Sequence, residues 1–533
     1  MRPKSDCFLL ASNLIAIDKN NGASLRPIAI GEYFYKLAAT RALMDVKKEI
    51  SKLLLPIQHG VAVPNGVEHV IHQTQHALEN EKVALTVDMK NAFNSISRAE
   101  MFAELYKHQC LRSIWKLVHF AYSNSSLLYV RNENHVQCPL LLSSQGVKQG
   151  DPLSAFLFSL TIQSSYVEAS NSVKNISMKC IMDDCTIVGN PEDILPVFNK
   201  FCEKVSDIGL EVQPHKSKLI HYNDTPLDKS LLDSLEALKI EIVKDTTILL
   251  GSPIGSDCES IDKTASEIIM KNQMLFDCLS SDHLSIQEAY TIIRLSTNTL
   301  IRHLARTVRP DAMIETAQLF DQTIRDIMMN KLKWNTLSPP QQQAAWAQMQ
   351  LPMRLGGIGL TSTTNILHAS YLASLIRSHE WSYTKNQTSF DTADKNTMLS
   401  PKLSDQIDKC ISKIQDQIPN TKCLTSLPNN VKDFKNLNML DKNSKNMESR
   451  RLQGTISRQI HKIEYHKAPQ IAKAKYLETK GSPIKDTNFA RRIAVAAKGA
   501  YDWLMAGCSN KDYILTDRYS LRKCYDPPHG PAS

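Results

Sequence analysis

Apolar runs alternate with polar turns through the N-terminal part of the chain. Asn13 to Ile17 and Ser24 to Gly31 flank the turn residues Asp18 to Gly22, which predicts a β-hairpin. Apolar residues then recur at helical spacing over 31–48 and, after a polar loop, over 67–78. The pattern therefore predicts a hairpin followed by two helices.

The next apolar run, Val83 to Val87, has the length of a buried strand and ends directly at Asp88. A carboxylate at the end of a buried strand is expensive to desolvate unless a positive group lies near it. A helical pattern follows over 96–105. Farther on, a glycine-rich turn over 144–153 leads into an apolar helix over 153–162, so that backbone amides and a helix N-terminus are presented together.

The most informative stretch runs from Cys180 to Gly189, where two adjacent acids separate two apolar, partly β-branched runs. This pattern predicts a tight β-hairpin with Asp183 and Asp184 at its turn. Two carboxylates a few Å apart repel strongly in a partly buried site unless a cation lies between them, and a divalent metal is the natural candidate. Acids are also common turn residues, so a polar turn without a metal is the alternative that this dipeptide alone leaves open.

Downstream, the spacing of apolar residues predicts helices over 261–333, and Ser338-Pro339-Pro340 breaks this pattern. Helices are predicted again over 346–376. The stretch 382–445 is rich in Asn, Asp, Ser, Thr and Lys with sparse apolar periodicity, which is typical of a linker or a mobile helical connection.

Composition narrows the class of protein. A chain of 533 residues that is 42% hydrophobic and 22% charged is long enough for two or three globular domains. Neither a signal-peptide pattern nor a run of about 18 apolar residues is present, so we expect an intracellular protein. The cysteines include no Cys-x-x-Cys pair, which argues against a disulfide framework and a zinc ribbon.

The positive charge is concentrated at the C-terminal end. Residues 441–533 hold eighteen Lys and Arg against nine Asp and Glu, so this segment accounts for the whole net charge of +9. Bases interleaved with aromatic and apolar residues suit contact with a phosphate backbone. A solvated helical face without a partner is the alternative.

The order of motifs between Leu25 and Gly251 resembles the palm of reverse transcriptases, more narrowly those of non-LTR (LINE-type) retrotransposons. The matching segments are Leu25-Arg26-Pro27-Ile28, Gln58-His59-Gly60, Asp88 with Ala92-Phe93, Gln145-Gly146, Gly150-Asp151-Pro152-Leu153 with Leu157-Phe158, Met182-Asp183-Asp184, Gly209-Leu210 with Lys216, and Leu249-Leu250-Gly251.

This resemblance implies RNA-directed DNA polymerase activity with two Mg²⁺ ions, for which Mn²⁺ can substitute. Asp88, Asp183 and Asp184 would hold the metals, which activate the primer 3′-hydroxyl and steady the leaving pyrophosphate. Lys216 matches a lysine that acts as general acid toward pyrophosphate. The implied partners are an RNA template, a DNA primer or target and dNTPs, and the implied location is the nucleus.

The resemblance also implies a set of substrate-binding residues. Lys19 and Arg26 would meet the triphosphate of the incoming nucleotide, whose developing charge they would stabilise. Phe93 matches the bulky residue that excludes a ribose 2′-hydroxyl. Gln145 and Gly146 match the loop that packs against the template and the nascent base pair.

We therefore predict an α+β, right-hand polymerase fold with fingers, a palm containing an antiparallel sheet, and a helical thumb, followed by a basic helical region. The expected divisions are fingers and palm over 1–223, a strand and helical thumb over 224–380, a polar linker over 381–445 and a basic helical tail over 446–533.

Some positions depart from the family pattern. Ile181 stands where an aromatic residue usually begins the hairpin, Asn94 where many relatives have Asp, and Gln213 where many have Asn. The fingers before Ser12 look short and no endonuclease domain is present, so we expect a piece of a longer open reading frame. The alternative hypothesis is a catalytically inactive nucleic-acid-binding remnant of such an element, and a third is a domesticated polymerase with another template.

Overall fold

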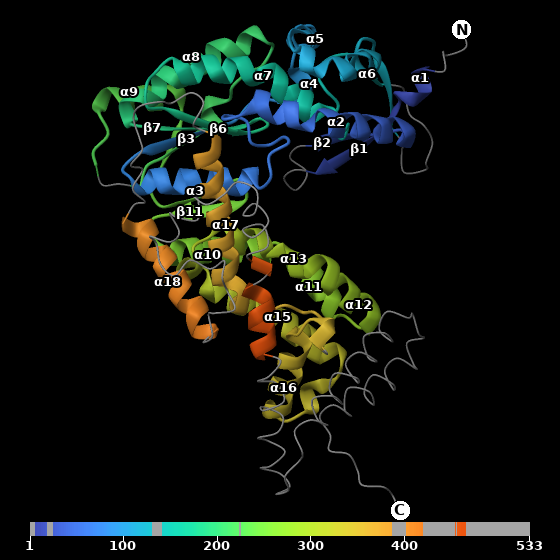
Figure 1. Cartoon of the computed structure of the whole chain (residues 1–533), viewed down its shortest axis with the longest axis vertical. Coiled ribbons are helices and arrows are strands. Elements are labelled where there is room, and N and C mark those ends of the chain that lie inside the picture. Colours follow the sequence, from blue (N-terminus) through green and yellow to red (C-terminus); the bar gives the residue numbers. More distant parts are fainter. Residues whose placement is uncertain are drawn as a thin grey trace, which may run out of the picture. The chain divides into compact units, whose positions relative to one another are not determined.

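The computed structural model describes most of the chain up to residue 385 and two shorter segments beyond it. The described residues are 6–18, 25–130, 141–222, 225–355, 357–385, 401–418, 453–454 and 456–464. The chain divides into two compact units, Met1–Lys244 with Thr384–Lys395 and Asp245–Tyr383 with Asn396–Ser533 (Figure 1). None of the described helices combines the length and apolar character that crossing a membrane requires.

A mixed five-stranded sheet lies at the centre of the first unit. Its strand order is β6-β7-β3-β8-β9, and only the β8–β9 pair is parallel. The strands are β3 (Val83–Val87), β6 (Ser177–Ile181), β7 (Asp184–Gly189), β8 (Lys218–Ile220) and β9 (Glu241–Val243). β3 takes the central position because its short apolar run suits burial on both faces, and Val83, Ala84 and Leu85 are 0% exposed.

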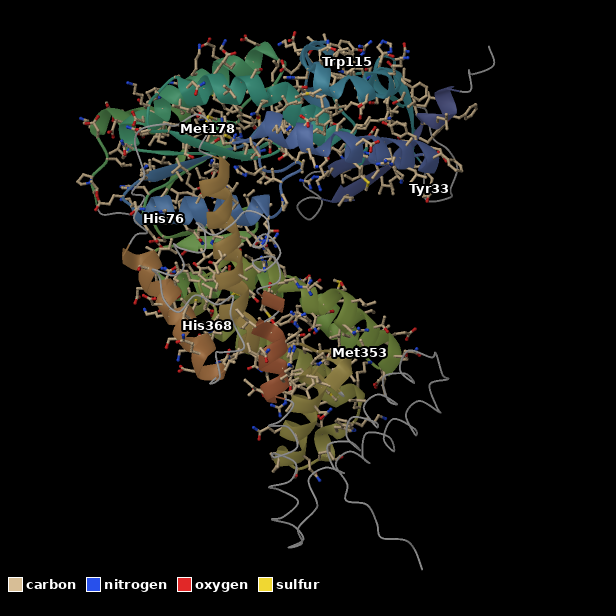
Figure 2. All side chains as sticks on the ribbon, in the orientation of Figure 1. Tyr33, His76, Trp115, Met178, Met353 and His368 are labelled. Atoms are coloured by element: carbon tan, nitrogen blue, oxygen red, sulfur yellow. The ribbon has the colours of Figure 1, made fainter. Side chains whose placement is uncertain are left out.

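Helices cover both faces of this sheet. In Figure 1, α7 and α8 lie on one face and α3 on the other. Met178 of β6 is 2% exposed among the covered side chains, whereas Tyr33, at the start of α2, is 67% exposed and points outward (Figure 2). The helices of this unit are α1 (Asp6–Leu9), α2 (Tyr33–Leu54), α3 (Gly66–Glu79), α4 (Ala92–Ser95), α5 (Arg98–Lys107), α6 (Arg112–Tyr122), α7 (Ser154–Asn171), α8 (Pro191–Asp207) and α9 (Lys229–Leu238).

A second, four-stranded sheet in the same unit contains the predicted N-terminal hairpin. β1 (Ser12–Asp18) and β2 (Leu25–Gly31) are antiparallel, which confirms the prediction. β1 also pairs in parallel with β4 (Ser126–Val130), and β4 pairs with β5 (Leu141–Ser143). The following helix α2 starts with the Glu32 carboxylate accepting from the Phe34 amide, which satisfies an amide at the helix N-terminus.

The second unit is largely helical. The helices predicted over 261–333 are confirmed, and α16 begins where the two prolines interrupt the pattern. The elements are β10 (Thr246–Leu249), β11 (Ser252–Gly255), α10 (Cys258–Met270), α11 (Gln273–Ser280), α12 (Ile286–Ile292), α13 (Asn298–Leu300), α14 (Arg302–Thr307), α15 (Ile314–Lys331), α16 (Pro339–Gln350), α17 (Thr363–Lys385) and α18 (Pro401–Gln417). The α+β class expected from the sequence is thus confirmed.

α18 lies within the stretch expected to be a polar linker. Its Ile407, Ile411 and Ile414 side chains are buried in a cluster with Leu372 of α17 and Ile456. Their spacing places them on one face of a helix. The many polar residues around them make this apolar pattern hard to recognise in the sequence. The basic tail beyond residue 464 lies outside the described residues.

Candidate active site

The acidic residues meet at one end of the central sheet. Val87 of β3 pairs with Cys185 of β7, Asp88 directly follows Val87, and Asp184 directly precedes Cys185. Continuing the antiparallel register by one residue therefore sets Asp88 opposite Asp184. On the other side of β7, Ile181 pairs with Asp184, which leaves Met182 and Asp183 as a two-residue turn. The predicted hairpin is confirmed, with the refinement that Asp184 already belongs to the strand.

The exposure of these acids suits a site open to substrate. Asp88 and Asp183 are half-buried and Asp184 is exposed. Among the described residues, no three His, Cys, Asp or Glu side chains are grouped to hold a metal ion by themselves. Mg²⁺ nevertheless binds well through one or two carboxylates when substrate phosphates and water supply its other ligands. The facing pair Asp88 and Asp184 fits such a shared site, and a preformed protein cage is not needed.

The backbone of Asp88 is held on both sides by the segment 213–217. The Gln213 amide donates to the Asp88 carbonyl at 2.8 Å, and the Asp88 amide donates to Ser217 Oγ at 3.3 Å. Ser217 Oγ in turn donates to the Gln213 carbonyl at 3.1 Å. Lys216 lies in this segment with an exposed side chain whose Nζ donates to Gln213 Oε1 at 2.9 Å. The structure thus places Lys216 on the chain segment that braces Asp88.

Phe93, Gln145 and Gly146 also come together, although they are far apart in sequence. The Val147 amide donates to the Phe93 carbonyl at 2.7 Å, and Gln145 Nε2 donates to the Ser95 carbonyl at 3.1 Å. Gly146 has φ +60, and a Cβ there would lie 2.4 Å from the Phe93 carbonyl oxygen. Only glycine fits such a close approach of two backbones.

The Phe93 ring itself is fixed by stacking. It lies parallel to the Phe158 ring of α7, with 4.6 Å between ring centroids and 9° between planes. The side chain is half-buried, so part of the ring remains accessible. The steric role expected of Phe93 stays a prediction.

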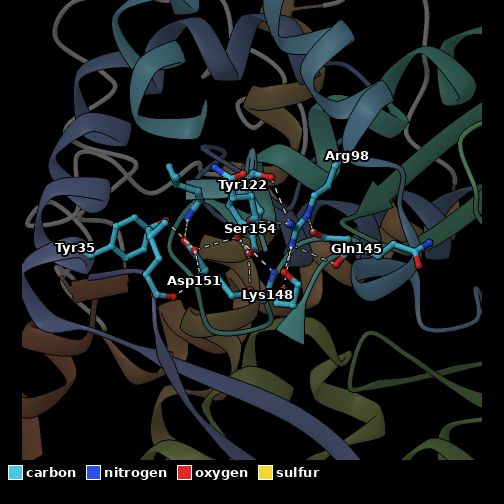
Figure 3. A network of polar contacts seen from close by, with 12 residues as sticks. Tyr35, Arg98, Tyr122, Gln145, Lys148, Asp151 and Ser154 are labelled. Carbon is cyan, nitrogen blue, oxygen red and sulfur yellow. Dashed lines mark hydrogen bonds and ion pairs between the residues drawn. The ribbon is translucent and has the colours of Figure 1, made fainter. Parts of the chain in front are cut away.

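Sequence reasoning missed the residues that support the loop carrying Gln145 and Gly146. Arg98, at the start of α5, donates to the Gly146 carbonyl at 2.9 Å and to the Ser143 carbonyl at 3.1 Å (Figure 3). Its guanidinium lies over the Tyr122 ring, 5.2 Å from the centroid. Burial lowers the pKa of Arg98, yet an arginine keeps its charge. Nothing near Arg98 in the sequence signals this role.

A buried acid supports the other end of the same loop. Asp151 accepts from the Tyr35 hydroxyl at 2.8 Å and the Tyr122 hydroxyl at 3.0 Å, and the Lys148 ammonium lies 4.0 Å away (Figure 3). Lys148 Nζ also donates to the Leu10 carbonyl at 3.2 Å. Burial lowers the pKa of Lys148, and the Asp151 charge partly offsets that effect. Burial and the nearby Asp151 charge raise the pKa of the Tyr122 hydroxyl well above its usual range, so it stays a donor.

Arg26, one of the two residues expected to bind the triphosphate, lies on the other sheet. Arg26 is exposed near the start of β2, opposite Ile17 of β1. β2 runs beside the supported loop, because the Ala29 amide donates to the Gln149 carbonyl at 2.7 Å. Lys19 lies outside the described residues.

Parts of the chain are similar in sequence to known proteins. Residues 17–254 match the family described as "Reverse transcriptase (RNA-dependent DNA polymerase)". The chain is 23% identical over 353 residues to the retrotransposable element SLACS 132 kDa protein of Trypanosoma brucei gambiense, covering 66% of this chain and 28% of that protein. It is 25% identical over 207 residues to the retrovirus-related Pol polyprotein from the type-1 retrotransposable element R2 of Bradysia coprophila, covering 37% of this chain and 22% of that protein.

Solved structures with partial likeness include two telomerases. The telomerase of Candida albicans, solved with a fragment of telomeric RNA, matches 79% of this chain and 64% of its own at a TM-score of 0.42 and 11% identity. The apo telomerase of Candida tropicalis matches 73% of this chain and 68% of its own at a TM-score of 0.40 and 11% identity.

Proposed function

Residues 17–254 form a reverse transcriptase domain related to those of non-LTR retrotransposons, and from this we propose that the chain is an RNA-directed DNA polymerase. The observation that carries the proposal is the β3–β7 register, which sets Asp88 opposite Asp184 at an open end of the sheet. The chain spans less than a third of the length of the curated relatives it matches. Activities that need the rest of such a protein are therefore outside this proposal.

In the proposed reaction, the primer 3′-hydroxyl releases its proton to solvent and its oxygen attacks the α-phosphorus of a dNTP, while the bond from that phosphorus to the oxygen of the β-phosphate breaks to release pyrophosphate. Asp88 and Asp184, with Asp183 at the turn, would hold Mg²⁺ at this end of the sheet. Mg²⁺ bound there supplies Lewis-acid stabilisation of charge on the attacking and leaving oxygens. Lys216 would donate a proton to the pyrophosphate as it leaves.

The remaining residues would select and orient the substrates. Arg26, together with Lys19, would neutralise the triphosphate as negative charge develops. The stacked Phe93 ring would occupy the space that a ribose 2′-hydroxyl needs, which favours deoxynucleotides. Gln145 and Gly146 would lie against the template and the new base pair, and the contacts of Arg98 and Asp151 would keep their loop in place.

We further propose partners that follow from this chemistry. They are an RNA template, a DNA primer or target and dNTPs, with the helices of the second unit serving as the thumb that holds the duplex. The basic segment 441–533 would add contacts to the phosphate backbone of the nucleic acid. The affinity of the chain for nucleic acid would therefore fall steeply as the salt concentration rises. A chromosomal target implies action in the nucleus.

A second candidate function is nucleic-acid binding without catalysis. It would apply if Mg²⁺ does not bind, because the described His, Cys, Asp and Glu residues include no group of three that could hold a metal without ligands from substrate and water. In that case the chain would keep the primer–template duplex but would not extend it. Both candidate functions therefore include binding of the primer–template duplex, and only the polymerase would extend the primer.

Primer extension on an RNA template with dNTPs and Mg²⁺ separates them. The full chain is compared with the Asp183→Ala, Asp184→Ala double variant, and binding of both to the same labelled duplex is measured by fluorescence anisotropy. We expect the wild-type chain to extend the primer and the double variant to bind without extension. Binding by the wild-type chain without extension at any Mg²⁺ or Mn²⁺ concentration would overturn the polymerase proposal and favour the second candidate.

A further inference from the structure

The segment just after α2 pairs with the edge of the hairpin that carries the two adjacent acids. The Cys180 amide donates to the Ile57 carbonyl at 2.9 Å, and the His59 amide donates to the Cys180 carbonyl at 2.7 Å. A parallel bridge joins Gln58 to Cys180. This pairing extends the sheet beyond β6 and brings Gln58 beside the turn.

The Gln58 side chain holds both polar groups of one turn residue. Its Oε1 accepts from the Met182 amide at 2.7 Å, and its Nε2 donates to the Met182 carbonyl at 3.0 Å. The same Oε1 also accepts from the Gly60 amide at 3.0 Å. Gln58 is 0% exposed, so water does not compete for these bonds. The Tyr166 hydroxyl adds a second donor to the Met182 carbonyl at 3.1 Å.

Met182 needs this support because of its backbone conformation. Its φ is +57, in the left-handed region that glycine adopts freely and other L residues rarely adopt. Asp183 and Asp184 follow directly, so the direction in which their carboxylates leave the turn depends on that conformation. A strained conformation persists only where surrounding contacts hold it.

The space between Gln58 and the turn is also restricted. A Cβ at Gly60 would lie 2.8 Å from the Met182 amide nitrogen and 3.0 Å from Gln58 Oε1. Glycine at this position therefore lets the Gln58 segment approach the turn closely. The Gln58 side-chain amide can then accept from the Met182 amide and donate to the Met182 carbonyl.

We propose that Gln58 is a positioning residue that holds Met182 in the left-handed conformation and thereby aims the carboxylates of Asp183 and Asp184. The inference rests on the proposed function for its catalytic meaning, but its structural content concerns the turn alone. It makes a residue of the segment after α2, 124 positions away in sequence, a determinant of metal affinity.

The test first removes the hydrogen bonds of the Gln58 side chain. It then removes the backbone strain at Met182 that those bonds hold in place. Gln58→Met keeps the length of the side chain and removes all three of its hydrogen bonds. Met182→Gly lets the turn adopt a positive φ without help. Gln163→Met is the matched control, because Gln163 is also buried in the first unit and donates to the Leu54 carbonyl at 2.9 Å, which also accepts from the Gln58 backbone amide, and the Gln163 bond leaves the side-chain contacts of Gln58 with Met182 in place.

Two readouts do not require polymerase activity. Mn²⁺ binding is followed by electron paramagnetic resonance, and amide hydrogen exchange is followed by mass spectrometry of the peptide that spans the turn. We expect Gln58→Met to weaken Mn²⁺ binding by about tenfold and to speed exchange at the turn. The Gln58→Met, Met182→Gly double variant should recover most of both losses, and Gln163→Met should show neither.

The proposal is overturned if Gln58→Met matches Gln163→Met in both readouts, or if Met182→Gly restores nothing. If Gln58→Met does not fold, Gln58→Glu replaces it, since a carboxylate still accepts from the Met182 and Gly60 amides but cannot donate to the Met182 carbonyl. The turn peptide of Gln58→Glu should then exchange faster than that of the wild-type chain, but more slowly than expected for a turn without any bond from residue 58. Exchange at the wild-type rate would overturn the proposal. A wild-type chain that binds Mn²⁺ but extends no primer would refute the polymerase proposal. The positioning role of Gln58 would still be tested by Mn²⁺ binding and by hydrogen exchange at the turn.

Discussion

Asp151 is the buried carboxylate that joins the loop carrying Gln145 to α2 and α6, and replacing it with alanine tests that support. Its side chain is 3% exposed and accepts from the Tyr35 and Tyr122 hydroxyls and from the Leu153 amide. The Lys148 side chain beside it is 4% exposed. Asp151→Ala therefore leaves a buried ammonium without its carboxylate and removes the acceptor of three buried donors.

The size of the effect follows from these contacts. Breaking a buried ion pair by removing one partner costs about 3–5 kcal/mol. Lys148 keeps its bond to the Leu10 carbonyl and Tyr122 keeps a contact with Ser154 Oγ at 3.1 Å, so the lower end is appropriate. We expect Asp151→Ala to lower the free energy of unfolding of the first unit by about 3 kcal/mol.

The assay is urea-dependent hydrogen exchange of the full chain, read from peptides of α7 so that the second unit does not contribute to the signal. Adding Lys148→Met to Asp151→Ala should restore about 1–2 kcal/mol, because an apolar side chain of similar length no longer leaves a charge buried. A loss below about 1 kcal/mol for Asp151→Ala, or no recovery in the double variant, would refute the assignment of the network as the support of this loop.

Three further substitutions test other parts of the account. Gly146→Ala should destabilise the loop by about 1–3 kcal/mol, since its Cβ would meet the Phe93 carbonyl at 2.4 Å, and unchanged thermal unfolding would contradict this. Phe93→Ala should lower the preference for dNTPs over rNTPs by about tenfold or more in single-nucleotide extension, and an unchanged ratio would remove Phe93 from sugar selection. Burial lowers the pKa of His59 well below its usual range, so the folded state binds fewer protons than the unfolded state. The free energy of unfolding should therefore be highest above pH ~6.5 and should fall by up to about 1.4 kcal/mol for each pH unit below that value. His59→Asn should flatten that dependence in urea titrations at pH 5.5 and 7.5, and an equal slope in both chains would contradict it.

Local patterns were sufficient to predict the elements that hold the acids. The apolar runs on either side of Asp183 and Asp184 predicted their hairpin, and the short run before Asp88 predicted β3. The register between β3 and β7 could not be predicted in the same way, because it depends on pairing between residues about 100 positions apart. That register is what sets Asp88 opposite Asp184.

The partners of residues that act through distant contacts could not be predicted from local patterns. Tyr35 and Asp151 are 116 positions apart, and Gln58 and Met182 are 124 apart. Gln58 and Asp151 lie in motifs that carry the resemblance, yet no pattern along the chain identifies Met182 or Tyr35 as their partners, and only the folded chain shows these bonds. The pattern over 31–48 ends before α2 does for a different reason, since the polar residues from Lys47 to Glu49 mask the buried Ile50 and Leu54 that continue its apolar face.

The most direct test of the central claim is single-turnover addition of one dNTP to a primer on an RNA template by wild-type and Asp88→Asn chains. Asparagine keeps the size and the backbone bonds of Asp88 but removes the charge that would face Asp184 across the metal. We expect a loss of at least about a hundredfold in the rate of addition, or roughly 2.7 kcal/mol of barrier, with duplex binding unchanged. Addition at the wild-type rate by Asp88→Asn would show that the acids opposite each other on β3 and β7 do not form the reacting centre.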